Sequence, residues 1–427
     1  MSMPDPQTRL LFTDLLGLSH GKTVPSTRAQ HPTHYALTVM LQGLDREFIE
    51  LKGYSTDVGF PDMEARLDEA SLRPSWSGGE VAMTNLHFSD GRPLPLCVRS
   101  RLREMIERWR ARDLEPLCGI EMEFYLLSGQ CVADGPLSVP WHRVYGTGPG
   151  ADPSGLIDEI AAACERAGIG MEGINSEFNP GQVETAVSYR EALDAADAAF
   201  LFRELAREVA LGKGLGATFM ARPFNDSVGN GMHLNVSAAA PDGSNAFVDT
   251  DDAQGISQVC RWAIAGLLEH HAALTALFAP TVNSYKRLRP GMLAGYWATW
   301  GLDNRLTSVR VPGQRGQGTR IEHRTPDGSA SPHLALLGML AAALDGIERE
   351  LPLADPVFGD AEAHPGTDVH TASSLGQALD LLEQDSVLTE ALGPDLTTVF
   401  VKLKRDEVDR WEQSLTDWEV NTYGRVY

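Results

Sequence analysis

Two glutamates lie inside the apolar segment Cys118–Leu127, whose alternating side chains are typical of a β-strand. Because the side chains of a strand point alternately to opposite faces, Glu121 and Glu123 share one face, opposite Met122. Two carboxylates side by side on a buried strand repel each other, so they are either protonated or neutralised by a cation. The pattern therefore predicts a cation beside this strand, unless the face with the glutamates is open to solvent.

Three further glutamates and one histidine extend this set. Glu177 and Glu184 flank the turn Asn179–Gly181, which can bring their carboxylates together. Glu322 lies in a segment with strand-like spacing, and His233 follows a glycine-rich loop. Five glutamates and one imidazole form an oxygen-rich ligand set, which suits Mg²⁺ or Mn²⁺ and not Zn²⁺ or an iron–sulfur cluster. Mg²⁺ held by carboxylates usually acts on the phosphates of a nucleotide.

The loop before His233 contains two glycines. We expect Gly229 and Gly231 to adopt positive φ and to let the backbone lie close against a ligand. A histidine on a strand is more often a packed residue than a ligand, so His233 is a candidate only together with the glutamates.

Arginines are concentrated between residues 287 and 324, in a chain whose net charge is −22. The five candidates among them are Arg287, Arg305, Arg310, Arg320 and Arg324. The guanidinium fork matches the edges of carboxylates and phosphates, and arginines with metal ions stabilise phosphoryl transfer. A P-loop motif is absent from the sequence, so the pattern indicates phosphoryl transfer by another architecture. The alternative for any single arginine is an ion pair with a surface acid.

The composition excludes several classes of partner. Asp and Glu number 58 against 36 Lys and Arg, which argues against nucleic acid or an anionic membrane surface as the main partner. The five cysteines are scattered and form no CxxC pair, which favours a reducing cytoplasm. The segment Met1–Arg9 lacks the pattern of a signal peptide. We therefore expect a cytoplasmic protein.

The character of the chain changes near residue 100. Residues 1–100 are predicted to form short strands, including Phe48–Leu51 and Val81–His87. Residues 101–427 contain longer helical patterns, with Gly255–Phe278 as one helix. The sequence thus predicts an α+β fold with a small domain over residues 1–100 and a larger domain over residues 101–427.

Eight stretches together resemble the glutamine synthetase family, over nearly the whole chain. They are Gly119–Phe124, Glu177–Glu184, Ala217–Pro223, Gly229–His233, Ala279–Leu288, Asp303–Arg305, Arg310–Pro312 and Arg320–Asp327. The resemblance implies a β-grasp-like N-terminal domain and a catalytic domain built on a curved antiparallel sheet with helices. It also implies active sites between neighbouring subunits of a ring, commonly a homododecamer of two stacked hexamers.

The resemblance also assigns roles to individual residues. One metal ion would be held by Glu123, Glu177 and Glu184, and the other by Glu121, His233 and Glu322. Glutamate would be held by Arg287, Arg324 and the backbone of Gly229. ATP would be contacted by Glu172, Tyr189, Asn235, Ser237, Arg305, Arg310 and Arg320. Arg305 and Glu184 are the implied catalytic residues, in a reaction that phosphorylates the side chain of glutamate before an amine attacks it.

The sequence departs from the family where ammonium binds. Members that use ammonia carry an Asp in the N-terminal domain, where this chain has Lys52, although Asp57 lies close by. They also carry a Glu after a Pro-Gly-Tyr run, where this chain has Leu293. Desolvating a small cation without a carboxylate is costly, so the departures argue against ammonium and against polyamines.

We therefore predict a ligase for an apolar alkyl- or arylamine. The amine pocket is expected to include Lys52, Asp57 and the apolar residues Tyr54, Met292, Leu293 and Trp297. Three alternatives stay open. They are an ordinary glutamine synthetase in which Asp57 rescues ammonium binding, a γ-glutamylpolyamine synthetase, and a ring-forming protein without catalysis.

Overall fold

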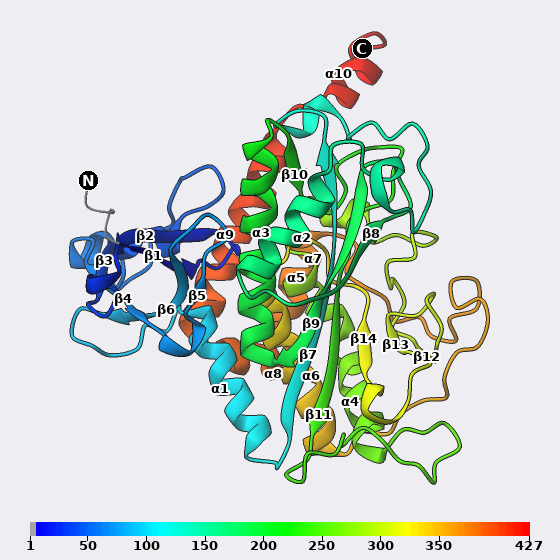
Figure 1. Ribbon diagram of the computed structural model, residues 1–427. Helices are drawn as coiled ribbons and strands as arrows, with labels where there is room; N and C mark the ends of the chain where they lie inside the picture. The colour runs from blue at the N-terminus through cyan, green and yellow to red at the C-terminus, as the bar shows by residue number, and fades with distance from the viewer. Residues whose placement is uncertain (1–5) are drawn as a thin grey trace.

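The computed structural model describes residues 6–427, which form two β-sheets with helices packed around and between them (Figure 1). The predicted α+β fold class is confirmed. Among the helices of residues 6–427, none combines the length and the apolar character needed to traverse a bilayer.

The first sheet contains the N-terminal strands. They are β1 (Gln7–Thr13), β2 (Ser19–Pro25), β3 (Thr33–Ala36), β4 (Asp62–Leu67), β5 (Arg73–Pro74) and β6 (Glu80–Phe88). Their order is β2-β1-β6-β4-β3, with β5 on β6, and β1 pairs with β6 in parallel. The strand predicted at Phe48–Leu51 is wrong. Phe48 makes only one bridge, to Gln42, across a tight turn in which Arg46 has a φ of 71°.

The second sheet is larger and carries most of the candidate site. Its strands are β7 (Glu115–Leu127), β8 (Met171–Ser176), β9 (Gln182–Glu191), β10 (Gly216–Thr218), β11 (Met232–Ala239), β12 (Trp300–Leu302), β13 (Val309–Val311) and β14 (Ile321–His323). Their order is β12-β13-β14-β11-β7-β9-β8, with β10 beside β7. Strands far apart in the sequence are thus neighbours at the centre, and β11-β7-β9 are paired antiparallel.

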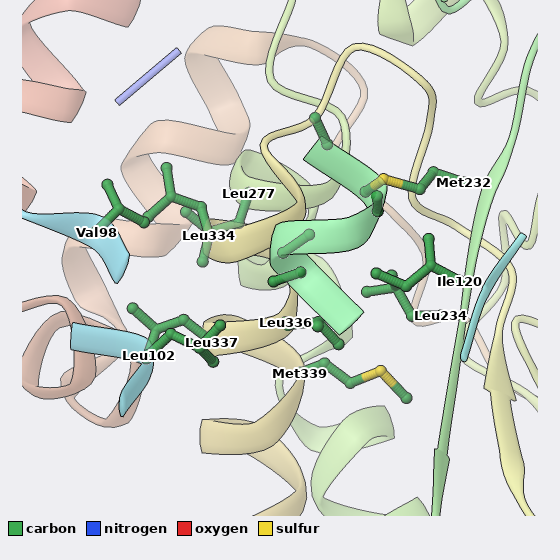
Figure 2. Close-up of a cluster of buried hydrophobic side chains, with 14 of the residues drawn as sticks. Val98, Leu102, Ile120, Met232, Leu234, Leu277, Leu334, Leu336, Leu337 and Met339 are labelled. Atoms are coloured by element: carbon green, nitrogen blue, oxygen red, sulfur yellow. The ribbon is translucent and has the colours of Figure 1, made fainter. Parts of the chain in front are cut away.

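The helices are α1 (Val98–Arg110), α2 (Leu156–Arg166), α3 (Ala192–Gly212), α4 (Gln258–Glu269), α5 (His271–Phe278), α6 (Pro332–Arg349), α7 (Leu375–Gln384), α8 (Ser386–Leu392), α9 (Pro394–Gln413) and α10 (Asp417–Tyr423). Most side chains of α6 are buried, because α1 and α3 and also α4 and α5 pack around it. Figure 2 shows its leucines between Val98 and Leu102 of α1 and the apolar face of β7 and β11. The α6 helix therefore supports the sheet from behind.

Alternation along β7 determines which residues face this support. Ile120, Met122 and Phe124 are at most 1% exposed and pack into the core. Glu121 and Glu123 lie on the opposite face, as their spacing predicts. The apolar core thus holds the strand rigidly while its other face presents carboxylates.

The helix predicted over Gly255–Phe278 is wrong as a single element. It divides at His270, which lies between α4 and α5. The imidazole of His270 bonds Asp385 through Nδ1 at 2.6 Å and Asp345 through Nε2 at 3.0 Å. The break therefore coincides with two contacts to distant segments, which helical periodicity cannot reveal.

Candidate active site

The acidic face of the second sheet brings residues from four strands together. Glu121 and Glu123 lie on β7, Glu184 on β9, His233 on β11 and Glu322 on β14. Strand register makes His233 the direct neighbour of Glu121 and makes Glu184 the direct neighbour of Glu123. Directly paired residues of antiparallel strands have their Cβ atoms about 5 Å apart, so the side chains share one space.

His233 lies between two groups of carboxylates. Its Nδ1 is 3.4 Å from Glu121 Oε2 and 3.7 Å from Glu322 Oε1, and its Nε2 is 3.8 Å from Glu123 Oε1. The ligand atoms of Glu121, His233 and Glu322 all lie within 4.8 Å of one another. The same is true of Glu123, Glu184 and His233. Each nitrogen of the ring therefore faces a different potential metal position.

Glu177 occupies a more distant position than its predicted partners. Among residues 6–427 it belongs to neither of the two compact groups. It follows β8 in the turn before β9, where its N–H donates to the carbonyl of Gln182 at 2.8 Å. Its side chain lines the same cavity as Glu123 and Glu184. The structure thus brings Glu177 to the wall of the site, with His233 nearer to the other two carboxylates.

The carboxylates of the site have opposed pKa shifts. Burial, together with the negative charges of Glu123, Glu121 and Glu177, raises the pKa of Glu184 to about 7 against the opposing influence of His233. Burial also acts on Glu322, but Arg324, His233 and Arg310 outweigh it and lower its pKa to about 2. One side of the site is therefore neutralised by arginines, and the side around Glu184 is short of positive charge.

Three arginines lie beside the acidic groups. Arg324 Nη1 donates to Glu322 Oε1 at 2.6 Å, and Arg310 Nη1 donates to Glu322 Oε2 at 2.8 Å. The Nε atoms of Arg310 and Arg324 are buried and have no partner within the described chain. Arg287 is 5% exposed and donates to the carbonyls of Thr325 and Arg324. These donors leave N–H groups available for an anionic ligand.

Gly229 and Gly231 have a different role from the one predicted. Neither has a positive φ. Close packing requires them instead, because a Cβ at Gly229 would lie 2.3 Å from the carbonyl oxygen of Ala221. A Cβ at Gly231 would lie 2.7 Å from His233 Nε2 and 3.1 Å from Arg287 Nη2. The glycines thus make room for His233 and Arg287.

Three connected cavities surround these groups. Cavity A, of about 280 Å³, is lined by Glu172, Tyr189, Asn235, Ser237, Arg320 and residues around them. Cavity B, of about 550 Å³, is lined by Glu121, Glu184, Arg305, Arg310 and Arg320 among others. Cavity C, of about 300 Å³, contains Glu123, Glu177, Gly229, Arg287, Leu293 and Arg324 in its lining. Glu121 and Arg320 border both A and B, while Glu184 and Arg305 border both B and C.

Asn235 connects cavity A to the acidic groups. Its Oδ1 accepts from Arg320 Nε at 2.9 Å, and its Nδ2 donates to Glu121 Oε1 at 3.1 Å. Only one orientation of the amide satisfies both partners, because arginine can only donate and an ionised carboxylate can only accept. Tyr189 and Ser237 form a hydroxyl–hydroxyl bond at the other side of the same cavity. Asn235 is therefore positioned to hold Glu121 and Arg320 together.

Only some of the residues predicted for the amine pocket line cavity C. Leu293 and Met292 line cavity C. Tyr54 does not, because it is buried in its own N-terminal region and its hydroxyl bonds Asp395. Lys52 and Asp57 are exposed on the same loop, where Asp57 Oδ2 accepts from the N–H of Gly53 at 2.7 Å. Trp297 packs edge-to-face on Tyr296 and His370, outside the lining of cavity C.

Several lining residues, including the following four, were not anticipated from the sequence. Val144, Tyr145 and Phe178 border cavity C, and Gln314 borders cavities A and B. Phe178 directly follows Glu177 in the glutamate-rich turn, so its position in the sequence could have indicated that it lies at the site. Val144 and Tyr145 lie in an irregular segment without periodicity, which gives no such signal.

The donor set fits divalent ions. Carboxylate oxygens predominate and one imidazole contributes nitrogen, a combination that suits Mg²⁺ or Mn²⁺. Glu121, His233 and Glu322 would hold one ion, and Glu123, Glu184 and either His233 or Glu177 would hold the other. The raised pKa of Glu184 agrees with this fit, because crowded buried carboxylates need a cation to remain ionised.

Comparison with known proteins identifies relatives along almost the whole chain. The family described as "Glutamine synthetase, catalytic domain" matches residues 95–423. A glutamine synthetase of Methanococcus voltae is 33% identical, over 91% of this chain and 89% of its own. The γ-glutamylethanolamide synthetase GlnA4 of Streptomyces coelicolor is also 33% identical, over 96% of this chain and 91% of its own.

Solved structures agree with these relatives. The structure described as "Apo GmaS without ligand" has a TM-score of 0.86 and 30% identity, covering 98% of this chain and 96% of that one. The structure described as "GmaS/ADP complex-Conformation 1" has a TM-score of 0.86 and 29% identity, covering 99% of this chain and 97% of that one.

Proposed function

Because this chain belongs to the glutamine synthetase family, whose members are ATP-dependent ligases that form C–N bonds, we propose that it joins the γ-carboxylate of L-glutamate to an amine other than ammonia. The products would be a γ-glutamylamide, ADP and phosphate. The enzyme uses ATP together with Mg²⁺ or Mn²⁺. The ions, when bound, neutralise negative charge on the phosphoryl group that is transferred.

The order of the cavities supports a place for each substrate. ATP would lie in cavity A, against Glu172, Tyr189, Asn235 and Ser237, with its phosphates in cavity B beside Arg305, Arg310 and Arg320. Glutamate would lie in cavity C. Its α-carboxylate would bind Arg287 and Arg324, and the backbone of Gly229 would lie against it. The γ-carboxylate would then lie near Arg305 and Glu184, which border both B and C.

In the first step, a γ-carboxylate oxygen of glutamate forms a bond to the γ-phosphorus of ATP while the bond to ADP breaks. In the second step, the amine nitrogen attacks the acyl carbon, phosphate leaves, and the nitrogen gives up a proton. Arg305 would stabilise the phosphoryl group in the first step and the departing phosphate in the second, because it lies where cavities B and C meet. Holding both reactants at this junction supplies much of the rate enhancement.

The side chains that line cavity C support the proposed class of amine. Leu293, which the resemblance to the family puts at the position of a glutamate in ammonia-using members, lies in this lining, and Val144, Phe178, Val228 and Met292 add apolar surface. The acids of the cavity are those that would hold metal ions. A polyamine would place its far ammonium group against apolar side chains, which is costly. An amine with an apolar body suits the cavity better, and an arylamine also arrives largely uncharged.

The relatives support an amine ligase without determining the substrate. GlnA4 is named for γ-glutamylethanolamide synthesis, and it is as similar to this chain as glutamine synthetases are. The ammonia-using alternative therefore stays in the test.

The test is phosphate release and product mass with ATP, glutamate and a panel of amines. The panel contains ammonium, methylamine, ethanolamine, butylamine, benzylamine, aniline and spermidine. We expect an alkyl- or arylamine to exceed ammonium at least tenfold in kcat/KM, and Leu293→Glu to shift the preference toward ammonium. A wild-type enzyme that uses ammonium or spermidine best would overturn the proposal.

The loop with Lys52 and Asp57 supports a proposal about assembly. Both residues are exposed and lie outside the lining of cavity C of their own chain. We propose that they reach the amine site of a neighbouring subunit, in a cytoplasmic homododecamer of two hexameric rings. We also propose the domain boundary near residue 100, in the first turn of α1. Light scattering measures the assembly, and a monomer with full activity would contradict the shared site.

A further inference from the structure

An apolar lip lies on one side of cavity C, formed by Val144, Tyr145, Phe178 and Leu293. The four residues are 41%, 65%, 64% and 53% exposed. Each of them also borders the cavity that contains Glu123, Glu184 and Arg324. Large apolar side chains gathered at the mouth of a polar cavity mark a binding surface more often than isolated exposed residues do.

Two members of the lip have strained backbones. Tyr145 has a φ of 58° and Leu293 a φ of 55°, the left-handed conformation that residues other than glycine rarely adopt. Neither residue is a glycine, asparagine or aspartate, for which this conformation is less costly. Such strain persists only where surrounding structure holds it, and it is concentrated at functional sites. Both strained residues line the same cavity.

The lip is fastened to the turn that carries Glu177. The N–H of Tyr145 donates to the carbonyl of Ser176 at 2.9 Å, and Ser176 Oγ donates to the carbonyl of Arg143 at 2.7 Å. His142 Nε2 lies 3.1 Å from the carbonyl oxygen of Phe178 and bonds it. Val144 and Phe178 are therefore held in a fixed relation to each other, although their side chains are exposed.

We propose that the apolar body of the amine lies on this lip, with Phe178 as the residue that determines amine specificity. This inference rests on the proposed function. With the γ-carboxylate beside Arg305 and Glu184, as proposed above, the amine nitrogen points toward these two residues and its substituent passes outward over the exposed lip. The ring of Phe178 offers a flat face on which an aromatic substituent stacks. The preferred class is a primary monoamine with an aromatic or bulky alkyl substituent.

The discriminating experiment compares benzylamine with methylamine. Methylamine has the same nucleophilic nitrogen as benzylamine, but its methyl group is too small to cover the lip. In Phe178→Ala, kcat/KM for benzylamine falls at least tenfold and kcat/KM for methylamine changes less than twofold, with the KM of ATP and of glutamate unchanged. Phe178→Leu restores part of the loss. Equal losses for both amines, or none for either, would overturn the assignment.

A second variant uses the strained backbone. Leu293→Gly removes apolar surface at a position whose φ suits glycine, so the variant folds at least as stably as the wild type. It loses discrimination between benzylamine and methylamine by at least threefold. Phe358→Ala is the matched control, because Phe358 is 72% exposed and borders none of cavities A to C. Its ratio of the two amines equals that of the wild type.

Two outcomes separate this inference from its premise. A wild-type enzyme that uses ammonium better than both amines would refute the proposed function and the lip with it. A wild-type enzyme that prefers benzylamine, together with an unchanged ratio in Phe178→Ala, would refute the lip alone. Light scattering on each variant tests whether the assembly is intact, and dissociation of the assembly in Phe178→Ala would assign Phe178 to a subunit contact and contradict the amine role.

Discussion

Two clusters of buried charge in this protein are built in opposite ways. The first lies among α1, α3 and α6, where Arg99 donates to both oxygens of Asp197, and His333 Nε2 lies 2.8 Å from Asp197 Oδ1. Arg99 also donates to Asp68 and Asn85. The pKa of Asp197 is held well below its usual range, because Arg99 and His333 outweigh the effect of burial. Each charge of this cluster has its partner within the chain.

The second cluster is the acidic face of the large sheet. Glu184 has carboxylates on three sides, and among the charged groups that influence its pKa only His233 opposes them. Buried like charges without counterions oppose folding, so a protein retains them where an external ligand supplies the missing charge. The first cluster therefore stabilises the fold, whereas the second is completed by divalent cations.

The largest effect is expected from Asp197→Asn. Removing the acid leaves the buried guanidinium of Arg99 without the counterion that accepts from both its Nε and its Nη2, which costs about 3–5 kcal/mol of unfolding free energy. Denaturant unfolding measures this loss. The matched control on the same helix is Asp194→Asn, whose half-exposed carboxylate pairs with Arg73 and contributes less than about 1 kcal/mol. Equal losses in the two variants would show that the first cluster does not stabilise the fold as described.

Glu184→Gln is expected to act on activity instead of stability. The substitution relieves repulsion in the metal-free protein, so its unfolding free energy stays equal or rises, while kcat/KM falls by about 10²–10³-fold. Denaturant unfolding in EDTA and steady-state kinetics provide the two readouts. A loss of stability as large as that of Asp197→Asn would contradict the distinction between the clusters.

The two clusters should also respond to pH with opposite signs. The folded-state pKa of Glu184 is raised to about 7, so the metal-free folded protein binds its proton more tightly than the unfolded chain does. Stability from this group is present at low pH and is lost, by about 1–3 kcal/mol, as pH rises from about 4.5 to 7. The pKa of Asp197 is lowered, so its contribution is present above about pH 4 and is lost as pH falls further.

Unfolding at a series of pH values in EDTA measures both effects. Mn²⁺ should abolish the loss between pH 4.5 and 7, and Glu184→Gln should lack it. A loss that persists in Glu184→Gln would assign it to other groups.

The smallest effect is expected at Asn235, which gives Glu121 a neutral partner and holds Arg320 beside it. Asn235→Leu removes both bonds and should raise the KM of ATP by about tenfold, equivalent to about 1.4 kcal/mol. Asn235→Asp should be worse, because it places a further carboxylate beside Glu121. Ser244→Ala, on an exposed turn outside the cavities, is the control. An unchanged KM in Asn235→Leu would remove the proposed positioning role.

The alternation of residues along one strand made the acidic face predictable. Features that depend on tertiary packing could not be predicted in this way. The spacing of Glu121 and Glu123 around Met122 placed both acids on one face of β7, and the resemblance to the glutamine synthetase family is confirmed. The cluster of Arg99 and Asp197 could not be anticipated, since the two residues are far apart in sequence and meet through the packing of α1 on α3.

The amine pocket was predicted least completely. Tyr54 reads as an available aromatic residue, but its hydroxyl bonds Asp395 of α9, which no local pattern reveals. The strained conformations of Tyr145 and Leu293 depend on contacts of the folded chain, so neither the lip nor its direction could be derived from composition or periodicity.

The most direct test of the account is a titration of the metal-stripped, assembled enzyme with Mn²⁺, followed by calorimetry. We predict that each chain binds two Mn²⁺ ions. The number of bound ions falls in Glu184→Gln and is unchanged in Asp194→Asn. Absence of binding, or binding unaffected by loss of Glu184, would contradict the claim that divalent cations complete the acidic face.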